Sequence, residues 1–302
     1  MQKTLKISWT IFEPLFGFLI MAVLIEIGLG RAGLWPTALE TDAPLKILGL
    51  LVLMTHITIT AMSLSFHRMH THQGVKMHPA IDGAMQIWLW LTTSMSKRDW
   101  VSVHIYHHAH SDTDLDPHSP KMKGLGRIFF LGVYDYVIAK SHPDVVKLRK
   151  KIPENRLEKF IADNLLLGPI LMVVVYSILL GPRFGALLSV LTFAISPLFA
   201  VGGVNALAHY IGYKNHVTTD NSRNLGFLVP LNWMICGELD HNNHHAHPKS
   251  CSFQHRWYEF DIGYFYLRTM AKMGLADLKF VYTPKKKNVA SPVVLNLNEQ
   301  AS

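Results

Sequence analysis

Histidine makes up 18 of the 302 residues, and six of these histidines form two pentads of the pattern H-x-x-H-H. The first pentad covers residues 104–108 and the second covers residues 241–245. On an α-helix, steps of three and four residues return to the same face, so each pentad should direct three imidazoles toward one place. Neutral imidazole is the commonest protein ligand for Fe, Zn, Cu and Ni. The pentads therefore predict a metal centre assembled from distant segments.

A further pair, His67 and His72, follows an apolar stretch that ends at residue 66. Five residues of an ideal α-helix place two side chains about 140° apart. Either the pair straddles two metal ions, or the helix departs from α geometry at this point. Together with the pentads, the pair brings the number of imidazoles to eight, too many for one tetrahedral zinc. The count favours two metal ions.

Other motifs narrow the chemistry. The two cysteines, Cys236 and Cys251, form no C-x-x-C motif, so a thiolate metal site is not indicated. The sequence contains no H-E-x-x-H motif, no P-loop and no serine nucleophile elbow, which argues against a zincin protease, a P-loop nucleotide site and a serine hydrolase. A G-x-G-x-x-G occurs at 28–33, but it closes an apolar run instead of joining a strand to a helix. We interpret it as a chance match.

The elements that must position these histidines are long apolar runs. Hydrophobic residues are 49% of the chain and charged residues only 17%, which favours an all-α integral membrane protein with about four transmembrane helices. The expected spans are 11–30, 45–66, 160–180 and 185–207. Residues 80–96 are apolar but too short to span, so we expect an interfacial helix there. Residues 1–280 should form one membrane-embedded domain, followed by a polar, flexible tail over 281–302.

The expected membrane topology places all the histidine clusters on one side of the membrane. Four spans place both termini, the loop 67–159 and the region after 209 on one side of the membrane. That loop holds 14 Lys and Arg residues, whereas the opposite turns hold Arg31, Lys46 and Arg183. The positive-inside rule then predicts a cytoplasmic helical cap that carries the histidine clusters, with both termini also in the cytoplasm. The net charge of +8 fits anionic lipid or a phosphate-bearing substrate better than nucleic acid.

Four stretches carry a resemblance to a known family. They are HRMHTH (67–72), WVSVHIYHHAHSDTDLDPHS (100–119), NALAHYIGY (205–213) and GELDHNNHHAHP (237–248). The sequence resembles the membrane-bound fatty acyl desaturases, the stearoyl-CoA-type Δ9 group and its bacterial relatives, from about residue 45 to 275. The succession H-x4-H, H-x-x-H-H, H-x-x-H-H is the signature of that family.

The resemblance implies a site with two iron ions. Its histidine ligands would be His67, His72, His104, His107, His108, His209, His241, His244 and His245. Asn205 would join them through a bound water. Near the first pentad, Asp112, Asp116 and His110 are candidates to support the ligands, the carboxylates by accepting the free ring N–H of an imidazole.

The resemblance also implies an activity and its partners. Such an enzyme uses O2 and two external electrons to remove two hydrogens from a saturated fatty acyl chain, leaving a cis double bond, most often at Δ9. The acyl chain is carried by coenzyme A or by a phospholipid. The electron donor is a separate rubredoxin, ferredoxin or cytochrome b5-type protein with its reductase. The expected location is the bacterial inner membrane, in contact with lipid.

Two rival interpretations remain at this stage. A related di-iron hydroxylase of alkyl chains or lipids would begin with the same hydrogen abstraction and differ only in its product. A histidine-rich metal transporter would need polar ligands inside the spans. Only His56 lies within a predicted span, whereas the clusters stop at one membrane face. The spacing of the histidines favours the desaturase.

Overall fold

The computed structural model describes residues 43–284, so the predicted span 11–30 and most of the predicted tail 281–302 lie outside the described residues. The described part is mostly helical. Its one sheet pairs two short antiparallel strands, β1 (Val75–Met77) and β2 (Ala276–Leu278), and joins the beginning of this part to its end.

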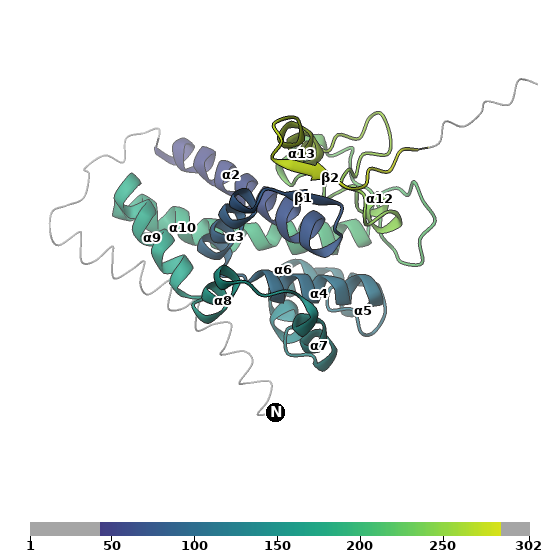
Figure 1. The fold of residues 1–302 in the computed structure, drawn as a ribbon, viewed down its shortest axis with the longest axis horizontal. Helices are drawn as coiled ribbons and strands as arrows, with labels where there is room; N and C mark the ends of the chain where they lie inside the picture. The colour runs from purple at the N-terminus through teal and green to yellow at the C-terminus, as the bar shows by residue number, and fades with distance from the viewer. Residues whose placement is uncertain (1–42, 285–302) are drawn as a thin grey trace, which may run out of the picture.

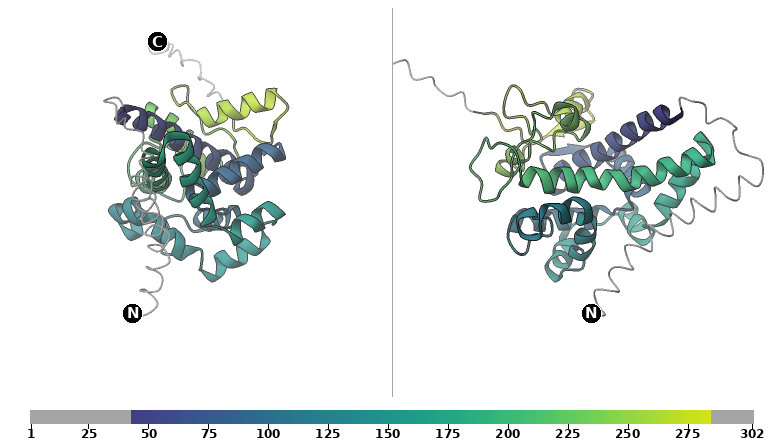
Figure 2. Two further views of the ribbon diagram at one scale, coloured as in Figure 1. Left: turned by 90° about the vertical axis from the view of Figure 1, so that its left-hand side faces the viewer. Right: turned by 180° about the vertical axis from the view of Figure 1, so that it is seen from behind.

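Two long helical stretches form the centre of the molecule (Figure 1, Figure 2). In the first, α2 (Ala43–Ala61) continues into the π-helix η1 (Met62–Thr71). In the second, α10 (Pro182–Pro197) continues into the π-helix η2 (Leu198–Ala206) and the short η3 (Leu207–His209), and α2 packs against α10. The ranges Leu45–Thr71 and Pro182–His209 contain 27 and 28 residues, and an 18-residue window within each has a mean hydropathy of 2.0 and 2.1, respectively. Both are long and apolar enough to cross a bilayer.

The predicted span 160–180 is not one continuous helix. It is divided between α8 (Arg156–Asp163) and α9 (Leu167–Leu180), whose axes meet at 87°. Side chains outside this pair satisfy backbone carbonyls at the bend, because Trp90 Nε1 donates to the carbonyl of Asn164 and Ser94 Oγ donates to that of Leu165. With these partners in place, the carbonyls freed by the break do not remain unsatisfied in a buried setting.

α3 (Pro79–Thr93) occupies most of the range expected for a short helix. Pro79 sits at the first helical position, where its missing N–H costs no hydrogen bond, and the helix ends at Ser94 in the left-handed region with φ 57°. α3 packs against α9 and α2, so it fills the space between the two long stretches and the bent pair.

The remaining helices lie in two groups that flank the ends of the long stretches. One group, below the long stretches in Figure 1, contains α4 (Lys97–His110), α5 (Pro120–Lys123), α6 (Leu125–Ala139) and α7 (Pro143–Lys151). The other contains α11 (Val229–Met234), α12 (His241–Ala246) and α13 (Ile262–Lys272), joined by long loops. α4 is capped by Ser96, whose hydroxyl accepts from the amide of Asp99, and it packs against η1 and α7.

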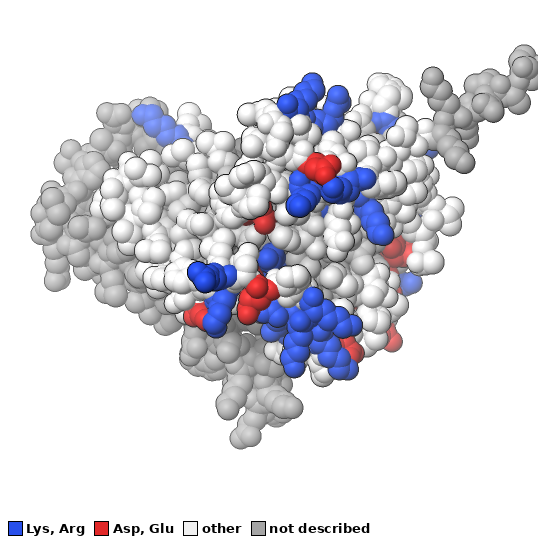
Figure 3. Space-filling model, in the orientation of Figure 1, with Lys and Arg blue, Asp and Glu red and all other residues white. Residues whose placement is uncertain are grey.

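Charge is unevenly distributed over this fold. In Figure 3, lysines and arginines gather over the half that contains α7 and α13, whereas the half built from α9 and the beginning of α2 is almost uncharged. That apolar half exposes large side chains, among them Leu45 at 72%, Ile178 at 76% and Leu179 at 70%. An exposed apolar surface of this kind marks contact with lipid or with a partner, and it supports membrane association of the chain.

Candidate metal centre

The π-helix η1 brings His67 and His72 to the same side of the chain. The amide of His72 donates to the carbonyl of His67 at 3.1 Å, a bond that spans five residues instead of the four of an α-helix. The wider turn returns the chain to the same face after five residues, and the two ring centroids lie 4.9 Å apart. Of the two explanations offered by the spacing, the structure shows the departure from α geometry.

All nine predicted histidines converge, but in two groups. The five-histidine group contains His67, His72, His104, His108 and His244. The four-histidine group contains His107, His209, His241 and His245. Within each group, one ring nitrogen from every histidine lies within 4.8 Å of the others. Each group therefore has the size of one metal site.

The expectation that each pentad serves one point is wrong. In the first pentad, His104 and His108 are one α-helical turn apart and enter the five-histidine group, while His107 enters the other group. In the second pentad, His241 and His245 are likewise one turn apart, and His244 enters the five-histidine group. Each pentad thus reaches both groups, and its neighbouring rings, such as those of His107 and His108 with centroids 5.5 Å apart, connect them.

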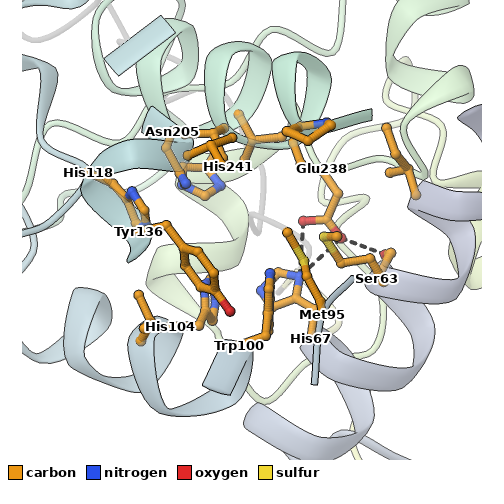
Figure 4. Close-up of a pocket in the computed structure, with 18 residues that line it drawn as sticks. Ser63, His67, Met95, Trp100, His104, His118, Tyr136, Asn205, Glu238 and His241 are labelled. Carbon is orange, nitrogen blue, oxygen red and sulfur yellow. Dashed lines mark hydrogen bonds and ion pairs between the residues drawn. The ribbon is translucent and has the colours of Figure 1, made fainter. Parts of the chain in front are cut away.

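Asn205 lies in η2, on the side of the four-histidine group. It is buried, with 9% of its surface exposed, and it lines the same cavity as His241 (Figure 4). Like η1, η2 is a π-helix, and it leads directly into η3, which ends at His209. The structure therefore places Asn205 beside the group that has one histidine fewer.

The two predicted aspartates contact histidines of the four-histidine group through the ring nitrogen that faces away from the group. His107 Nδ1 donates to Asp116 at 2.8 Å, and His209 Nδ1 donates to Asp112 at 3.0 Å. Burial opposes ionisation of Asp112, but the hydrogen bond and charge of His209 lower the pKa of Asp112 to about 2. His110 differs, since its ring packs against Tyr106 at 4.5 Å and the structure records no contact between it and either group.

Two further carboxylates do the same and were missed in the sequence. His67 Nδ1 donates to Glu238 at 3.0 Å, and His245 Nδ1 donates to Asp220 at 2.7 Å. Glu238 stands three residues before the second pentad, so its position in the sequence could have indicated a carboxylate that supports the histidines. Asp220 lies in a loop 25 residues before His245, and no spacing rule connects the two. A carboxylate on Nδ1 fixes the imidazole tautomer and leaves Nε2 free to bind a cation.

The electrostatics of the groups favour neutral imidazoles, the form that binds metals. Burial, with repulsion from neighbouring histidines, holds the pKa values of His104, His108 and His244 well below the usual value. His107 is the exception. Burial lowers its pKa, but the charge and hydrogen bond of Asp116, together with the charges of Asp112 and Asp220, outweigh burial and raise the pKa of His107. A cation at Nε2 would take the place of the proton on that ring.

The ring nitrogens that face into the groups support the same assignment. Nε2 of His72, His107 and His245 is buried without a hydrogen-bond partner among the described residues. Nε2 of His244 lies 3.0 Å from Nε2 of both His67 and His108. A ring nitrogen carries either one proton or one lone pair, so hydrogen bonds cannot satisfy both contacts at once. Buried polar atoms of this kind need partners, and one metal ion in each group would supply them. The residues present therefore fit two metal ions.

An apolar cavity borders both groups (Figure 4). It encloses about 780 Å³, its open mouth included. His67 and His104 reach it from the five-histidine group, and His241 reaches it from the four-histidine group. The rest of the wall is mainly hydrophobic, with Ile59, Met62, Met95, Trp100, Val103, Val133, Pro197, Ala200, Val201 and Val204. A long apolar ligand in this cavity would lie directly against the histidine groups.

Comparison with known proteins agrees with this geometry. The sequence profile of the family described as "Fatty acid desaturase" matches residues 44–277. Delta-9 acyl-lipid desaturase 2 of Arabidopsis thaliana is 29% identical over 237 residues, which cover 76% of this chain and 73% of that protein. The sn-1 stearoyl-lipid 9-desaturase of Synechocystis sp. is 28% identical over 236 residues, covering 78% and 72%. The sn-1 stearoyl-lipid 9-desaturase of Anabaena variabilis is 28% identical over 217 residues, covering 71% and 76%.

Proposed function

Because the chain belongs to the fatty acid desaturase family, we propose that it converts a saturated fatty acyl chain to a cis-Δ9 monounsaturated chain, using O2 and two external electrons. The observation that carries this proposal is the apolar cavity, which both histidine groups border. A saturated alkyl chain offers no hydrogen-bonding groups for recognition, so only an apolar cavity of matching shape can bind it and place chosen carbons beside the site.

Two iron ions, one in each histidine group, would supply the oxidising chemistry that a C–H bond without an acid or a leaving group requires. The five-histidine group would hold one, and the four-histidine group, with Asn205 acting through a water, would hold the other. The donor set supports iron, since imidazole nitrogen suits iron and no thiolate enters either group.

The chain's own side chains would bind the acyl chain, orient the histidine rings and shield the site from water. Trp100 stacks on the ring of His104 with centroids 4.6 Å apart and also lines the cavity, so it fixes a ligand ring and covers the acyl chain. The carboxylates of Asp112, Asp116, Asp220 and Glu238 hold four ligand rings by Nδ1. The hydrophobic wall excludes water, which limits side reactions of the oxidising site.

The names of the relatives support the position of the double bond and the carrier of the chain. Several relatives are acyl-lipid or stearoyl-lipid 9-desaturases. We therefore propose position 9 and an acyl chain esterified to a membrane lipid, with acyl-CoA as the alternative carrier. A rubredoxin, a ferredoxin or a cytochrome b5-type protein would deliver the electrons.

The membrane arrangement completes the proposal. The described residues contain two stretches able to cross a bilayer, and the bent pair α8 and α9 would add a third. With the predicted span 11–30, this gives four spans in one domain over 1–280. The histidine groups would then lie in a cytoplasmic cap, on the same side as both termini, at the inner membrane of a bacterium. The excess of Lys and Arg in the loop 67–159 supports this orientation.

His56, the histidine within the predicted span 45–66, has ordinary packing partners. Its Nδ1 lies 2.8 Å from the carbonyl of Met234 and its Nε2 lies 2.9 Å from the hydroxyl of Tyr266. With both nitrogens engaged, His56 offers no free ligand along the helix. This arrangement argues against a path for metal ions across the membrane and favours the enzyme.

The fatty-acid profile of a bacterial host that expresses the full chain tests the proposal. Gas chromatography with mass spectrometry should show a new cis-Δ9 acyl chain, and His107→Ala and His244→Ala should each abolish it while protein remains in the membrane. His110→Ala, outside both groups, is the matched control and should retain the product. A hydroxylated chain would indicate the related hydroxylase chemistry, and full activity of His107→Ala would contradict the assignment of the site.

A further inference from the structure

A second collection of rings lies beside the metal centre and belongs to neither group. His216, His247, His255 and Tyr282, here called the outer cluster, come from three separate segments. His216 Nε2 lies 2.7 Å from His255 Nδ1. The ring of Tyr282 stacks on that of His247 with centroids 3.7 Å apart and lies 4.3 Å from that of His255. His255 is 5% exposed, and its Nε2 has no hydrogen-bond partner among the residues that the structure describes.

Hydrogen bonds connect the outer cluster to the two asparagines of the second pentad. The amide of His216 donates to Asn242 Oδ1 at 2.9 Å, and Asn242 Nδ2 donates back to the carbonyl of His216 at 3.1 Å. Asn242 follows the ligand His241 directly in the chain. From the outer cluster to the four-histidine group there is therefore one pair of hydrogen bonds and one peptide link.

A parallel connection reaches the five-histidine group. The amide of His255 donates to Glu259 Oε2 at 2.8 Å, and Asn243 Nδ2 donates to the same oxygen at 2.8 Å. Asn243 directly precedes the ligand His244. Asn243 is fully buried and Glu259 likewise, so this connection runs through protein and not through solvent.

The segments that carry the outer cluster present exposed basic and aromatic side chains, and Arg256 Nε donates to Asn215 Oδ1, which joins two of these segments. Each of its histidines has an exposed cation one or two residues away: Lys214 near His216, Lys249 near His247 and Arg256 beside His255. Trp257, next to Arg256, is 91% exposed. Exposed Trp beside Arg is the composition of binding hot spots at protein interfaces, and a cluster of positive charge selects and steers a negatively charged partner.

We propose that this surface, defined by Lys214, Lys249, Arg256 and Trp257, docks an acidic protein that carries one electron at a time, and that the outer cluster is where its electrons enter. The proposal rests on the proposed function, which needs an external donor. Two dockings would deliver two electrons from two reduced carriers, each carrier being oxidised by one electron. With two protons and one O2, these electrons balance the loss of two hydrogens from the acyl chain and the formation of two waters.

A protein partner fits this surface better than a lipid surface does. The loops that carry the outer cluster extend from the end of the molecule where α12 lies, while the apolar ends of α9 and α2 lie at the opposite end (Figure 1, Figure 2). The surface therefore points away from the part of the fold that contacts hydrocarbon. Transient electron-transfer complexes use small interfaces, so a few cations and one tryptophan suffice.

Binding of purified full-length protein in detergent to soluble carriers tests the proposal without reference to turnover. The probes are a rubredoxin, a ferredoxin and a soluble cytochrome b5 domain, with basic cytochrome c as the control carrier. At least one acidic carrier should bind, more weakly as salt rises, and the double variant Lys249→Glu/Arg256→Glu should raise its Kd by at least about tenfold. Lys150→Glu/Lys151→Glu on α7 is the matched charge control and should bind like the parent.

Activity then separates this inference from the proposed function. With the acidic carrier as donor, Lys249→Glu/Arg256→Glu should form product at least about tenfold more slowly than the parent at limiting carrier. With a photoreduced flavin as a small donor, both should form product equally. The docking surface would be overturned if the variant bound the carriers normally or if the parent bound none of the acidic carriers. It would also be overturned if the variant differed from the parent only when both were placed in nanodiscs of anionic lipid. Absence of product from the parent with every donor would instead overturn the proposed function.

Discussion

Glu238 orients the imidazole ring of His67: it accepts a hydrogen bond from His67 Nδ1 at 3.0 Å and another from Ser63 Oγ at 2.5 Å (Figure 4). All three side chains are buried, and all three line the cavity. The carboxylate thus links the tautomer of one ligand of the five-histidine group to the wall that would contact substrate.

Replacing Glu238 with Gln should weaken metal binding by the five-histidine group about 10- to 100-fold, because the orienting negative charge behind His67 is lost. Titration of the metal-free protein with ferrous iron, followed by elemental analysis, measures the change. Glu154→Gln is the matched control, since Glu154 is exposed and pairs with Arg98, which belongs to neither histidine group. Equal iron affinity in Glu238→Gln and the parent would show that the carboxylate has no supporting role.

The π-helical turn of η1 makes a second prediction. Inserting one alanine between Met69 and His70 should rotate His72 away from His67, because the bond from the His72 amide to the His67 carbonyl fixes their shared face. Iron content per chain should fall by about half as the five-histidine group loses a ligand and the other group keeps its own. An alanine inserted in the exposed loop at 153–155 is the control. An unchanged iron content in the η1 insertion would contradict the geometry.

The sequence predicted which nine histidines come together but not their division between two groups. Spacing along a helix reports which residues share a face, and it grouped His107 with His104 and His108, whereas the structure brings only His104 and His108 together. Spacing cannot report that His107, on the same helix, faces a second group formed by other segments. Asp220 was beyond reach for the same reason, because its contact with His245 depends on how a loop folds over α12. Such contacts are tertiary, and local periodicity carries no signal for them.

The membrane-spanning elements show the same limit. The apolar runs predicted the long stretches that begin near Leu45 and Pro182, because length and hydropathy alone decide whether a helix crosses a bilayer. The 87° bend between α8 and α9 depends instead on Trp90 and Ser94, which lie about 70 residues earlier and donate hydrogen bonds to the freed carbonyls. Hydropathy within 160–180 could not reveal partners outside that range.

Arg68, the neighbour of His67, connects the end of η1 to the loops before and after α12 through Cys236, Cys251 and Asp261. It is fully buried, donates to both oxygens of Asp261 at 2.8 and 3.0 Å, and lies over the ring of Phe253. Arg68→Met should lower the free energy of unfolding by roughly 3–5 kcal/mol, because it leaves Asp261 buried without its partner. Thermal unfolding in detergent should show a clear fall in Tm, whereas Arg156→Met at an exposed position should not. Equal Tm values for the two variants would contradict this role.

The cavity wall should set which acyl chains react. Ala200 lines the cavity, and Ala200→Phe would fill space that a long chain needs. Product from an 18-carbon chain should fall by roughly tenfold relative to product from shorter chains, as a few lost methylene contacts suffice for such discrimination. Ala194→Phe, exposed on the same helical stretch, is the control. Gas chromatography of products from mixed chain lengths measures the ratio, and an unchanged ratio would place the acyl chain elsewhere.

Product analysis with purified, iron-loaded protein tests the central claim most directly. The full chain would receive a saturated acyl lipid, a photoreduced flavin as electron source, and O2. The account predicts two irons per chain and a cis double bond at position 9, with no hydroxylated product. A full iron complement together with an unchanged or hydroxylated acyl chain would contradict it.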